Sequence, residues 1–496
     1  MSFINRRHYV NSLITIYIGS TRCRVCIPIK HPLMLPIREV LRRRLSEYAY
    51  NPRTHQYELL YRFYRYNKRR NELLIPINAL FMITDELDML GGNYTIKNES
   101  IVEGRAIETK LNESFKPRDD QKDIIEYMKN DDPVRSLVGL QTGKGKTVVS
   151  IAASIMRGKC CMVVVSGLVD QWVKQYRAFS NVGERIVVVQ GIKSLIDLIE
   201  SDYKPDVIVF SLETLRLYVL RAPNYEDLPP YEKFIEYFGI DTKIFDEVHR
   251  AHNAFTIIDL HSNIKKNIYL TATYNQTSAQ ARRIFNIIYP PEQIRGLENR
   301  DRYIRVWSYG YRIHVPERVY HKLRGYSHIK YEAYFYKRPT KLNHFFTTVL
   351  SPVINAHFIN RCKPGQRCLI YFSTIDMIMA AYQYLKKEYP QKKVGVYIGE
   401  SKEGSYNDYE IVVSNHKKAG TGLDMKELYL VINTVSFSTP MLTEQSLGRL
   451  RKLPNGETPE YIDLVNVSCS AQLMHRAERR RILEALALEY RETILP

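Results

Sequence analysis

The sequence predicts an α/β protein with two tandem lobes, each built on a parallel sheet, preceded by a small basic α+β domain. Short apolar runs such as CMVVV, RIVVV and DVIVF alternate with helical patterns in the middle of the chain, which is typical of a parallel sheet covered on both faces. The same texture returns near residue 367 with RCLIYF, EIVVS and LYLVIN. The length of 496 residues also exceeds one ordinary core. We therefore predict domains at 1–112, 113–305 and 306–496, with a connector near 298–318.

The charge of the chain points to a polyanionic partner. Lys and Arg number 72 against 53 Asp and Glu, a formal charge of +19. This surplus favours nucleic acid first and an anionic membrane surface second. No apolar run approaches the roughly 18 residues of a membrane-spanning helix. Asn11, Ser12 and Thr15 interrupt the N-terminal apolar run, which lacks a cleavage site. We expect mature protein and no membrane partner.

The cysteines indicate a reducing compartment. There are 7, an odd number without an even framework, so we expect a cytoplasmic protein. Cys23 and Cys26 have the spacing of half a zinc site, but no second pair lies nearby to complete it. Core positions are therefore the favoured interpretation, as they are for Cys160 and Cys161 at the start of an apolar strand.

The first predicted domain interleaves arginine with tyrosine. The segment 38–48 predicts an amphipathic helix with Leu41 and Leu45 inward and the three arginines between them outward. The segment YELLYRFYRYNKRR combines cations that neutralise phosphate with rings that stack on bases. It also fits a strand with one face on a core. Both interpretations hold if Tyr61, Phe63 and one other ring are buried while the arginines contact DNA. The candidate nucleic-acid contacts are Arg62, Arg65, Lys68, Arg69 and Arg70.

A glycine-rich turn opens the second predicted domain. The segment LQTGKGKTVVS lies between an apolar strand and a helix, where backbone N–H groups and a helix N-terminus can bind phosphate. In that geometry Lys146 reaches the β- and γ-phosphates and Thr147 places its hydroxyl on Mg²⁺. Gly143 and Gly145 allow a close approach. The generic pattern requires glycine where this chain has Leu140, so a surface turn rich in glycine and lysine is the alternative.

Two adjacent carboxylates follow a later strand. The segment KIFDEVH places Asp246 and Glu247 at the C-terminal end of that strand, where open α/β sheets bind ligands. We assign Mg²⁺ to Asp246 and the attacking water to Glu247. A solvated turn is the alternative for an isolated pair, and the phosphate loop makes it less favourable. His249 could report the nucleotide state through its hydrogen bonds, whereas we expect His252 at the surface.

These motifs resemble those of superfamily-2 helicases of the DExH kind. The segments QTGKGKT, DEVH, TAT and QSLGRLRK occur in that family's order. The family's loop is better written T-G-x-G-K-T, which accounts for Leu140. Within the superfamily, the chain looks most like the phage-encoded UvsW type of branch-migration helicase, with XPB-like translocases as relatives. The resemblance implies two RecA-like lobes, ATP with Mg²⁺ as cofactors, and a nucleic-acid track.

The resemblance also implies roles for residues outside these two motifs. In KPRDDQ, Gln121 would read adenine with Arg118 beside it. Arg449 would contact the γ-phosphate. The family pattern has a second arginine at position 452, where this chain has Lys452, and the nearest arginine is Arg451. Which of these two residues makes the second phosphate contact therefore stays open. The implied catalytic residues are Lys146, Asp246, Glu247, Gln445 and Arg449. The implied nucleotide-binding residues are Arg118, Gln121, Thr142, Gly143, Gly145, Lys146, Thr147, Gly422, Asp424, Arg451 and Lys452, with Thr147 and Asp246 on the metal.

Four further segments resemble the motifs that follow a nucleic-acid strand. They are VVVSGLVDQW, FSLETL, LIYFST and AGTGLDM. A translocating enzyme must tolerate every sequence, so we expect its contacts on phosphates. A Ser or Thr in a loop is also often a local backbone cap, and both roles stay open. The candidate contacts are Ser166, Ser211, Thr214, Ser373 and Thr421. The residues expected to couple the sites are His249, Thr271 and Thr273.

The sequence therefore predicts an ATP-dependent DNA helicase or translocase that acts on branched DNA in recombination, repair and replication. An RNA helicase or transcript-release ATPase on the same motor is the alternative. A clamp without enzymatic activity would be expected to lack Lys146, Glu247 or Arg449, and all three are present. We expect a monomer in the cytoplasm, which is the host cytoplasm if a phage encodes it.

Overall fold

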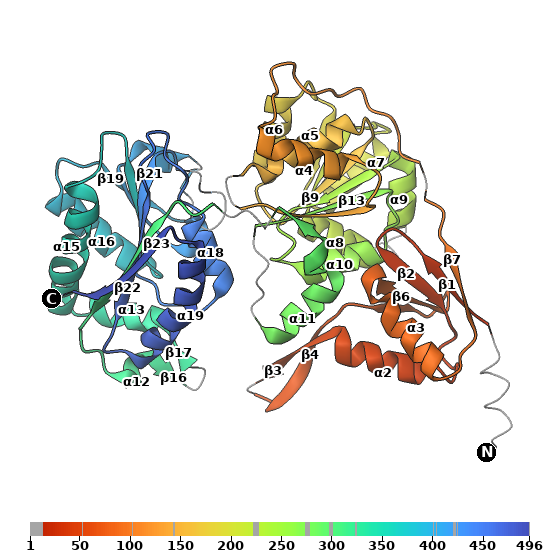
Figure 1. Cartoon of the computed structure of the whole chain (residues 1–496), viewed down its shortest axis with the longest axis horizontal. Helices are drawn as coiled ribbons and strands as arrows, with labels where there is room; N and C mark the ends of the chain where they lie inside the picture. The colour runs from red at the N-terminus through yellow and green to blue at the C-terminus, as the bar shows by residue number, and fades with distance from the viewer. Residues whose placement is uncertain are drawn as a thin grey trace. The chain divides into compact units, whose positions relative to one another are not determined.

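The computed structural model divides the chain into two compact units (Figure 1). They are Met1–Leu140 with Lys144–Glu298, and Gln141–Gly143 with Asn299–Pro496. The residues that the structure describes are 13–51, 53–101, 103–141, 144–221, 228–272, 278–296, 301–322, 325–399, 401–402, 404–419, 423 and 425–495.

The main sheet of the first unit has seven parallel strands in the order β10-β11-β9-β12-β13-β8-β14. The strands are β8 (Arg135–Gly139), β9 (Cys161–Val165), β10 (Ile186–Val189), β11 (Val207–Ser211), β12 (Thr242–Phe245), β13 (Lys266–Thr271) and β14 (Ile294–Arg295). Every residue of β9, β12 and β13 is buried. Strand β9 is the continuous apolar run that is typical of a strand covered on both faces and that predicted it, whereas β12 and β13 also contain buried polar residues such as Lys243, Lys266 and Asn267.

Helices cover both faces of this sheet. On β9, Met162 and Val164 face one hydrophobic cluster while Val163 and Val165 face another. The second cluster lies under α4 to α6 and the first under α7 to α11. The helices are α4 (Asp119–Lys129), α5 (Lys146–Met156), α6 (Val169–Phe179), α7 (Ile192–Glu200), α8 (Leu212–Arg221), α9 (Tyr231–Phe238), α10 (His252–Leu260) and α11 (Ala279–Ile288), with the short turn η3 (Pro291–Gln293).

The second unit contains another parallel sheet of seven strands, in the order β19-β20-β18-β21-β22-β15-β23. Its strands are β15 (Arg305–Tyr311), β18 (Arg367–Tyr371), β19 (Val394–Tyr397), β20 (Ile411–Ser414), β21 (Leu428–Asn433), β22 (Glu460–Asn466) and β23 (Glu489–Ile494). The two sheets confirm the predicted tandem parallel-sheet lobes. The predicted connector near 298–318 was wrong in part, because β15 lies inside it and pairs with β22 and β23.

The second sheet is also covered on both faces. Ile370 faces a cluster under α13 to α16, while Leu369 and Tyr371 face a cluster under α18 and α19. The elements around the sheet are α12 (Glu317–Tyr320), β16 (His321–Lys322), β17 (Gly325–Tyr326), α13 (His328–Tyr336), α14 (Pro339–Phe345), η4 (Phe346–Leu350), α15 (Ser351–Ile354), η5 (Asn355–Ile359), α16 (Ile375–Glu388), η6 (Ser405–Asp408), α17 (His416–Ala419), α18 (Pro440–Leu447) and α19 (Ser470–Leu486).

A smaller five-stranded sheet precedes the first parallel sheet, in the order β5-β6-β2-β1-β7. Leu41 and Leu45 are buried and residues 42–44 are exposed, which confirms the amphipathic helix, although it ends at Arg44. The chain then enters a hairpin, β3 and β4, that projects from this unit (Figure 1). The elements are β1 (Ile14–Ile18), β2 (Arg22–Cys26), α2 (Met34–Arg44), β3 (Ser46–Asn51), β4 (Gln56–Arg62), β5 (Arg65–Asn67), β6 (Glu72–Pro76), η1 (Ile77–Ala79), α3 (Leu80–Met89) and β7 (Tyr94–Asn98).

The N-terminal sheet shares a hydrophobic cluster with the first parallel sheet. The Phe63 ring stacks on the His252 imidazole, with centroids 5.2 Å apart and an interplanar angle of 3°. Thr21 Oγ1 donates to the backbone oxygen of Asp259 at 2.9 Å, and Arg22 Nη1 donates to that of Leu260 at 2.8 Å. Two predictions were therefore wrong: His252 is buried against Phe63, and Tyr61 is exposed because β4 pairs only with β3 in the described structure.

Phe63→Ala is expected to destabilise the first unit by about 3–5 kcal/mol, because it leaves a cavity against His252 and the shared cluster. The measurement is the free energy of unfolding in urea. Phe81→Ala is the matched control, since that ring is exposed, and it should cost less than about 1 kcal/mol. Equal losses in the two variants would contradict a shared core at Phe63.

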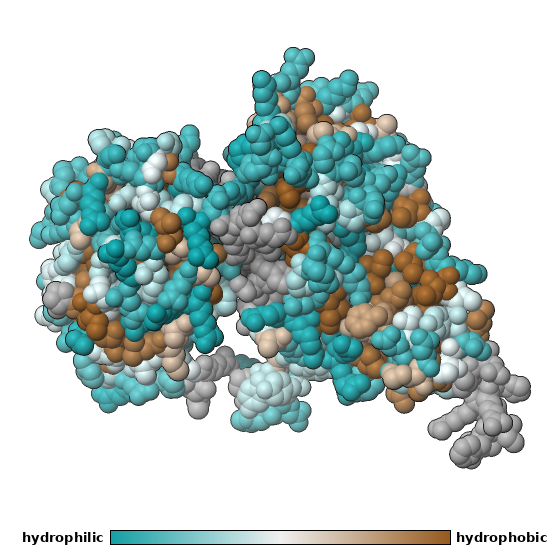
Figure 2. Space-filling view, viewed as in Figure 1, coloured by the Kyte–Doolittle hydropathy of each residue, from teal (hydrophilic) through white to brown (hydrophobic). Residues whose placement is uncertain are grey.

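Apolar side chains gather over the N-terminal sheet and α3 on the face that Figure 2 shows, and hydrophilic side chains cover much of the rest. Exposed apolar residues of this region include Phe81, Met89 and Ile96. Among the described residues, no helix is both long and apolar enough to cross a membrane.

Candidate nucleotide-binding site

Helix α5 begins directly after the glycine-rich loop. Its N-terminal cap is Gly145, with φ of 85°, a left-handed conformation that favours glycine. A Cβ at this position would lie 2.7 Å from Gln121 Nε2. Thr147 lies in the first turn, where backbone N–H groups have no partner within the helix. The loop therefore presents a helix N-terminus suited to phosphate. Thr142 and Gly143 lie outside the described residues.

The segment predicted to read adenine lies against this loop. Gln121 Oε1 accepts the backbone N–H of Arg118 at 3.1 Å, which caps α4. Gln121 Nε2 and Arg118 Nη2 both donate to the backbone oxygen of Lys144, at 3.1 Å and 3.0 Å. The structure thus brings Arg118 and Gln121 to the phosphate loop.

The carboxylate pair lies at the carboxyl end of β12 and contacts the loop lysine. Lys146 Nζ and Glu247 Oε1 are 2.9 Å apart, with the two side chains 9% and 27% exposed. Glu247 has φ of 55°, which is uncommon for a residue other than glycine and is a form of strain found at functional sites. The sheet therefore brings together two predicted residues that are far apart in the sequence.

Asp246 has a partner that the sequence interpretation missed. The buried indole of Trp172, on α6, donates its Nε1–H to Asp246 Oδ2 at 3.0 Å. A buried tryptophan needs a partner for its N–H, which was the available signal. Burial and the charge of Glu247 raise the pKa of Asp246 to about 6, against the opposing effects of Lys146 and Trp172.

The pKa of Glu247 moves in the opposite direction. Burial raises it, but the charge of the Lys146 ammonium outweighs burial and lowers the pKa to about 2, with a further contribution from the His249 ring, which is protonated only below about pH 4. Two neighbouring carboxyls whose pKa values are driven apart can take different roles at one pH. Glu247 is the fully ionised member of the pair.

His249 connects the carboxylates to β13. Its Nδ1 lies 2.9 Å from Thr271 Oγ1 and 3.3 Å from Glu247 Oε2. Burial lowers the pKa of His249 to about 4, so the ring is neutral at pH 7. The structure thus forms a chain of contacts from Glu247 through His249 to Thr271, whereas Thr273 lies outside the described residues.

Residues 114–276 match the family model described as Type III restriction enzyme, res subunit. That range contains the phosphate loop, the carboxylate pair and Thr271. The chain resembles the superfamily-2 helicases.

Two solved structures are among those similar to this helicase-like chain. T4 UvsW is 17% identical, with 98% of this chain and 100% of that chain covered and a TM-score of 0.37. The structure of S. cerevisiae Dbp5 bound to RNA and ADP BeF3 is 14% identical, with 77% of this chain and 90% of that chain covered and a TM-score of 0.48. No curated protein matches the sequence.

The donor set of the helicase-like site fits Mg²⁺. Asp246 offers a carboxylate and Thr147 a hydroxyl, and Mg²⁺ commonly binds one or two carboxylates together with substrate phosphates and water. The described residues contain no group of three or more His, Cys, Asp or Glu placed to hold an ion. Cys23 lies in the core, where burial raises its pKa to about 12 and keeps it a thiol.

Nucleotide affinity in the presence of Mg²⁺ is expected to fall below about pH 6. The burial of Asp246 raises its pKa to about 6, and only the ionised carboxyl can hold the metal. Affinity should therefore rise with pH up to that value and then level off. Titration of a fluorescent ATP analogue between pH 5 and 8 measures this, and Asp246→Asn should abolish the pH dependence along with most of the affinity. A flat profile in the unmodified protein would contradict the assignment.

The predicted nucleotide residues of the second unit are grouped around the end of α18. Arg449 Nη1 donates to the backbone oxygen of Leu423 at 2.8 Å, and Gln445 lies on α18 itself. Lys452 Nζ lies 3.0 Å from an oxygen of Asp301, so its charge is engaged within its own unit. The choice between Lys452 and Arg451 for the second contact stays a prediction. Gly422 and Asp424 lie outside the described residues.

The residues predicted to follow a nucleic-acid strand differ in their surroundings. Ser166 is exposed at the end of β9. The hydroxyls of Ser211 and Thr214 lie 2.7 Å apart. The backbone N–H of Thr214 donates to Ser211 Oγ at 3.3 Å and that of Gly191 donates to Thr214 Oγ1 at 2.7 Å, so both side chains make local backbone contacts, and their role at nucleic acid stays a prediction. The backbone N–H of Ser373 donates to Glu332 Oε1 at 2.7 Å, which leaves its hydroxyl as the candidate contact. Thr421 lies outside the described residues.

The five basic candidates of the N-terminal region separate into two groups. Arg62, Arg65 and Lys68 line one groove. Arg70 instead pairs with Glu232 at 3.7 Å, and Arg69 is exposed outside the groove lining.

Proposed function

We propose that this chain is an ATP-dependent DNA helicase or translocase that acts on branched DNA, such as forks, displacement loops and four-way junctions, in recombination, repair and replication. The observation that carries the proposal is the contact of 2.9 Å between Lys146 Nζ and Glu247 Oε1, with Asp246 beside it. It supports the proposal because phosphoryl transfer requires a cation for phosphate, a carboxylate for metal and a residue that orients water.

ATP would bind with its phosphates at the N-terminus of α5. Lys146 would contact them, and Thr147 and Asp246 would hold Mg²⁺, which neutralises phosphate charge when bound. Glu247 pairs with Lys146 in this structure. A triphosphate competes for that ammonium, so nucleotide binding would release Glu247 to orient the attacking water.

The remaining roles follow from the same proposal. His249 would pass the state of Glu247 to Thr271, with which it shares a hydrogen bond. Arg449 and Gln445 of the second unit would act on the same nucleotide, so that bound triphosphate favours closure of the motor. Residues 113–305 and 306–496 would be the motor lobes, and residues 1–112 would select the substrate. The surplus of 19 positive charges supports a nucleic-acid partner. The protein would act as a monomer in the cytoplasm.

ATP hydrolysis stimulated by a four-way junction, a fork, a linear duplex and a single-stranded RNA tests the proposal. Junction and fork should stimulate most, and Lys146→Ala should abolish hydrolysis with every substrate. Equal stimulation by all four would contradict a preference for branched DNA. A larger response to RNA than to any DNA would favour the alternative, an RNA helicase. If no substrate stimulated hydrolysis, the proposal that this protein is an ATPase would be contradicted.

A further inference from the structure

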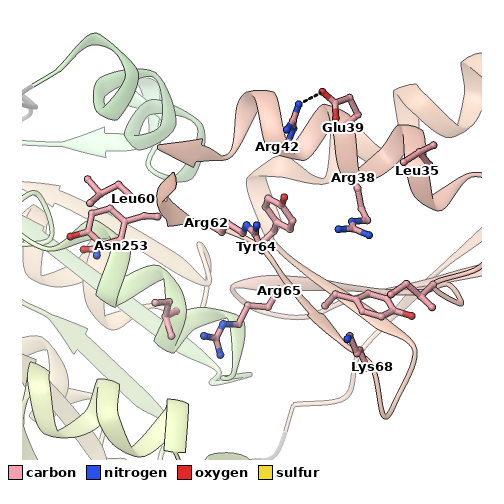
Figure 3. Close-up of a pocket in the computed structure, with 14 residues that line it drawn as sticks. Leu35, Arg38, Glu39, Arg42, Leu60, Arg62, Tyr64, Arg65, Lys68 and Asn253 are labelled. Atoms are coloured by element: carbon pink, nitrogen blue, oxygen red, sulfur yellow. Dashed lines mark hydrogen bonds and ion pairs between the residues drawn. The ribbon is translucent and has the colours of Figure 1, made fainter. Parts of the chain in front are cut away.

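A groove with a volume of about 850 Å³ lies within the first unit, away from the nucleotide site. Figure 3 shows α2 along one wall, with Arg38 extending from it, and Arg62, Arg65 and Lys68 along the strands of the other wall. Helix α10 closes the groove with Asn253 and Ile257. Three elements that are distant in sequence therefore form one hollow.

The groove carries far more positive than negative charge. Its lining has five cations, Arg38, Arg42, Arg62, Arg65 and Lys68, against one carboxylate, Glu39. Glu39 pairs with Arg42 at 3.1 Å, and within the described residues no carboxylate pairs with the other four cations. Four uncompensated charges around one hollow favour a ligand with several phosphates.

One of these four cations is partly withdrawn from water. Arg65 is half-buried on β5, and burial lowers its pKa. Desolvating a guanidinium without a carboxylate is unfavourable, and a bound phosphate would offset this cost through charge-assisted hydrogen bonds. A phosphate beside Arg65, which lines the groove, would therefore be favoured.

The groove also exposes apolar and aromatic side chains between its charges. Leu35 is 75% exposed, Leu60 47% and Tyr61 39%, and Tyr64 and Tyr66 are half-buried beside them. The outer surface of a duplex presents phosphates and keeps the faces of its bases stacked inside. A single strand offers both phosphates and base faces, which match cations and rings respectively.

We propose that this groove binds a short single-stranded segment of nucleic acid, with its phosphates on Arg38, Arg65 and Lys68 and bases against Tyr61 and its neighbours. This inference deepens the proposed function and rests on its nucleic-acid partner. It assigns a single-strand site to the N-terminal region, separate from the strand-following motifs of the motor. On a branched substrate, such a site would hold an unpaired arm.

Fluorescence anisotropy of the full chain without nucleotide tests the proposal with labelled DNA probes, a single strand of about 12 nucleotides and a duplex of equal length. Arg38→Gln with Lys68→Gln should weaken single-strand binding about tenfold and reduce the slope of log affinity against log salt by about 1.4. Tyr61→Ala should weaken single-strand binding about fivefold, with less than a twofold effect on duplex.

Lys122→Gln with Lys204→Gln is the matched control, because it removes two exposed cations of the same unit outside the groove. It should change affinity less than twofold, and all variants should keep the same unfolding midpoint. A groove variant that behaves like this control would overturn the proposal. So would equal effects of Tyr61→Ala on single strand and duplex, or equally tight groove-dependent binding to phosphatidylserine vesicles.

Failure of the groove proposal can be distinguished from failure of the proposed function. Binding is measured without ATP, and Lys146→Ala should retain the single-strand affinity of the unmodified chain. If the chain fails to hydrolyse ATP but the groove variants still bind the single strand more weakly, the proposed groove site is supported and the proposed ATPase motor is contradicted. A loss of single-strand binding in Lys146→Ala as large as in the groove variants would overturn a site separate from the motor.

Discussion

Glu247→Gln is expected to reduce ATP hydrolysis at least about 100-fold while ATP binding is retained or strengthened. An amide cannot supply the negative charge that orients and activates water. It also removes the ion pair with Lys146, whose Nζ lies 2.9 Å from Glu247 Oε1, so a phosphate no longer competes with a carboxylate for that ammonium. Single-turnover hydrolysis and the affinity of a fluorescent ATP analogue measure the two effects separately.

Glu126→Gln is the matched control, since Glu126 forms an exposed ion pair with Lys129 at 2.8 Å outside this site. Its hydrolysis should remain within twofold of the unmodified protein. If Glu247→Gln retained hydrolysis, or if both variants lost it equally, the proposed role of Glu247 in the reaction would be contradicted.

Lys146→Ala is expected to weaken ATP binding about 100-fold and to bring hydrolysis to background. Two charge-assisted contacts to phosphate of about 1.5 kcal/mol each account for that loss. Equilibrium binding of the ATP analogue measures it. Lys122→Ala, which removes an exposed cation paired with Asp119, is the control and should bind ATP normally.

The same variant has an effect on stability that depends on pH. Lys146 lowers the pKa of Glu247 to about 2, against 4.5 for the free group, so the pair stabilises the folded state above pH 4.5. The stabilisation is lost as pH falls toward 2. At pH 7 Lys146→Ala should therefore be less stable by about 3 kcal/mol, because it leaves a largely buried carboxylate without its cation, and the difference should shrink in acid. A difference that grows in acid would contradict the sign of this shift.

The buried strands could be predicted from sequence, whereas the edge strand and its neighbour could not. Strand β21 is buried throughout because both of its faces are covered, and its apolar run LYLVI shows this directly. β23 has the sequence EYRETI and lies at the edge of its sheet, where half of its surface meets water. β15 contains Ser308 and Gly310 between its aromatic residues. Neither strand has the continuous apolar run that identified the others.

The residues of the candidate site could be predicted where a motif contains them, but their partners could not. Lys146 and Glu247 follow from phosphate and metal chemistry at known positions along a sheet. Nothing local to Asp246 identifies Trp172 as its donor, and nothing local to His252 identifies Phe63 as its stacking partner. The groove could not be predicted for the same reason, because Arg38 on α2 and Lys68 line it together only once the chain has folded. Contacts between distant segments depend on the tertiary fold.

The interlocked core of the first unit has a mechanical consequence. Thr21 and Arg22 are hydrogen-bonded to the end of α10, and Phe63 is stacked at its beginning. If the N-terminal sheet holds a strand of nucleic acid as proposed, force on that strand would be transmitted to α10 through these contacts. Phe63→Ala would then be expected to weaken the mechanical connection between the N-terminal sheet and the proposed nucleotide site without changing the residues of that site.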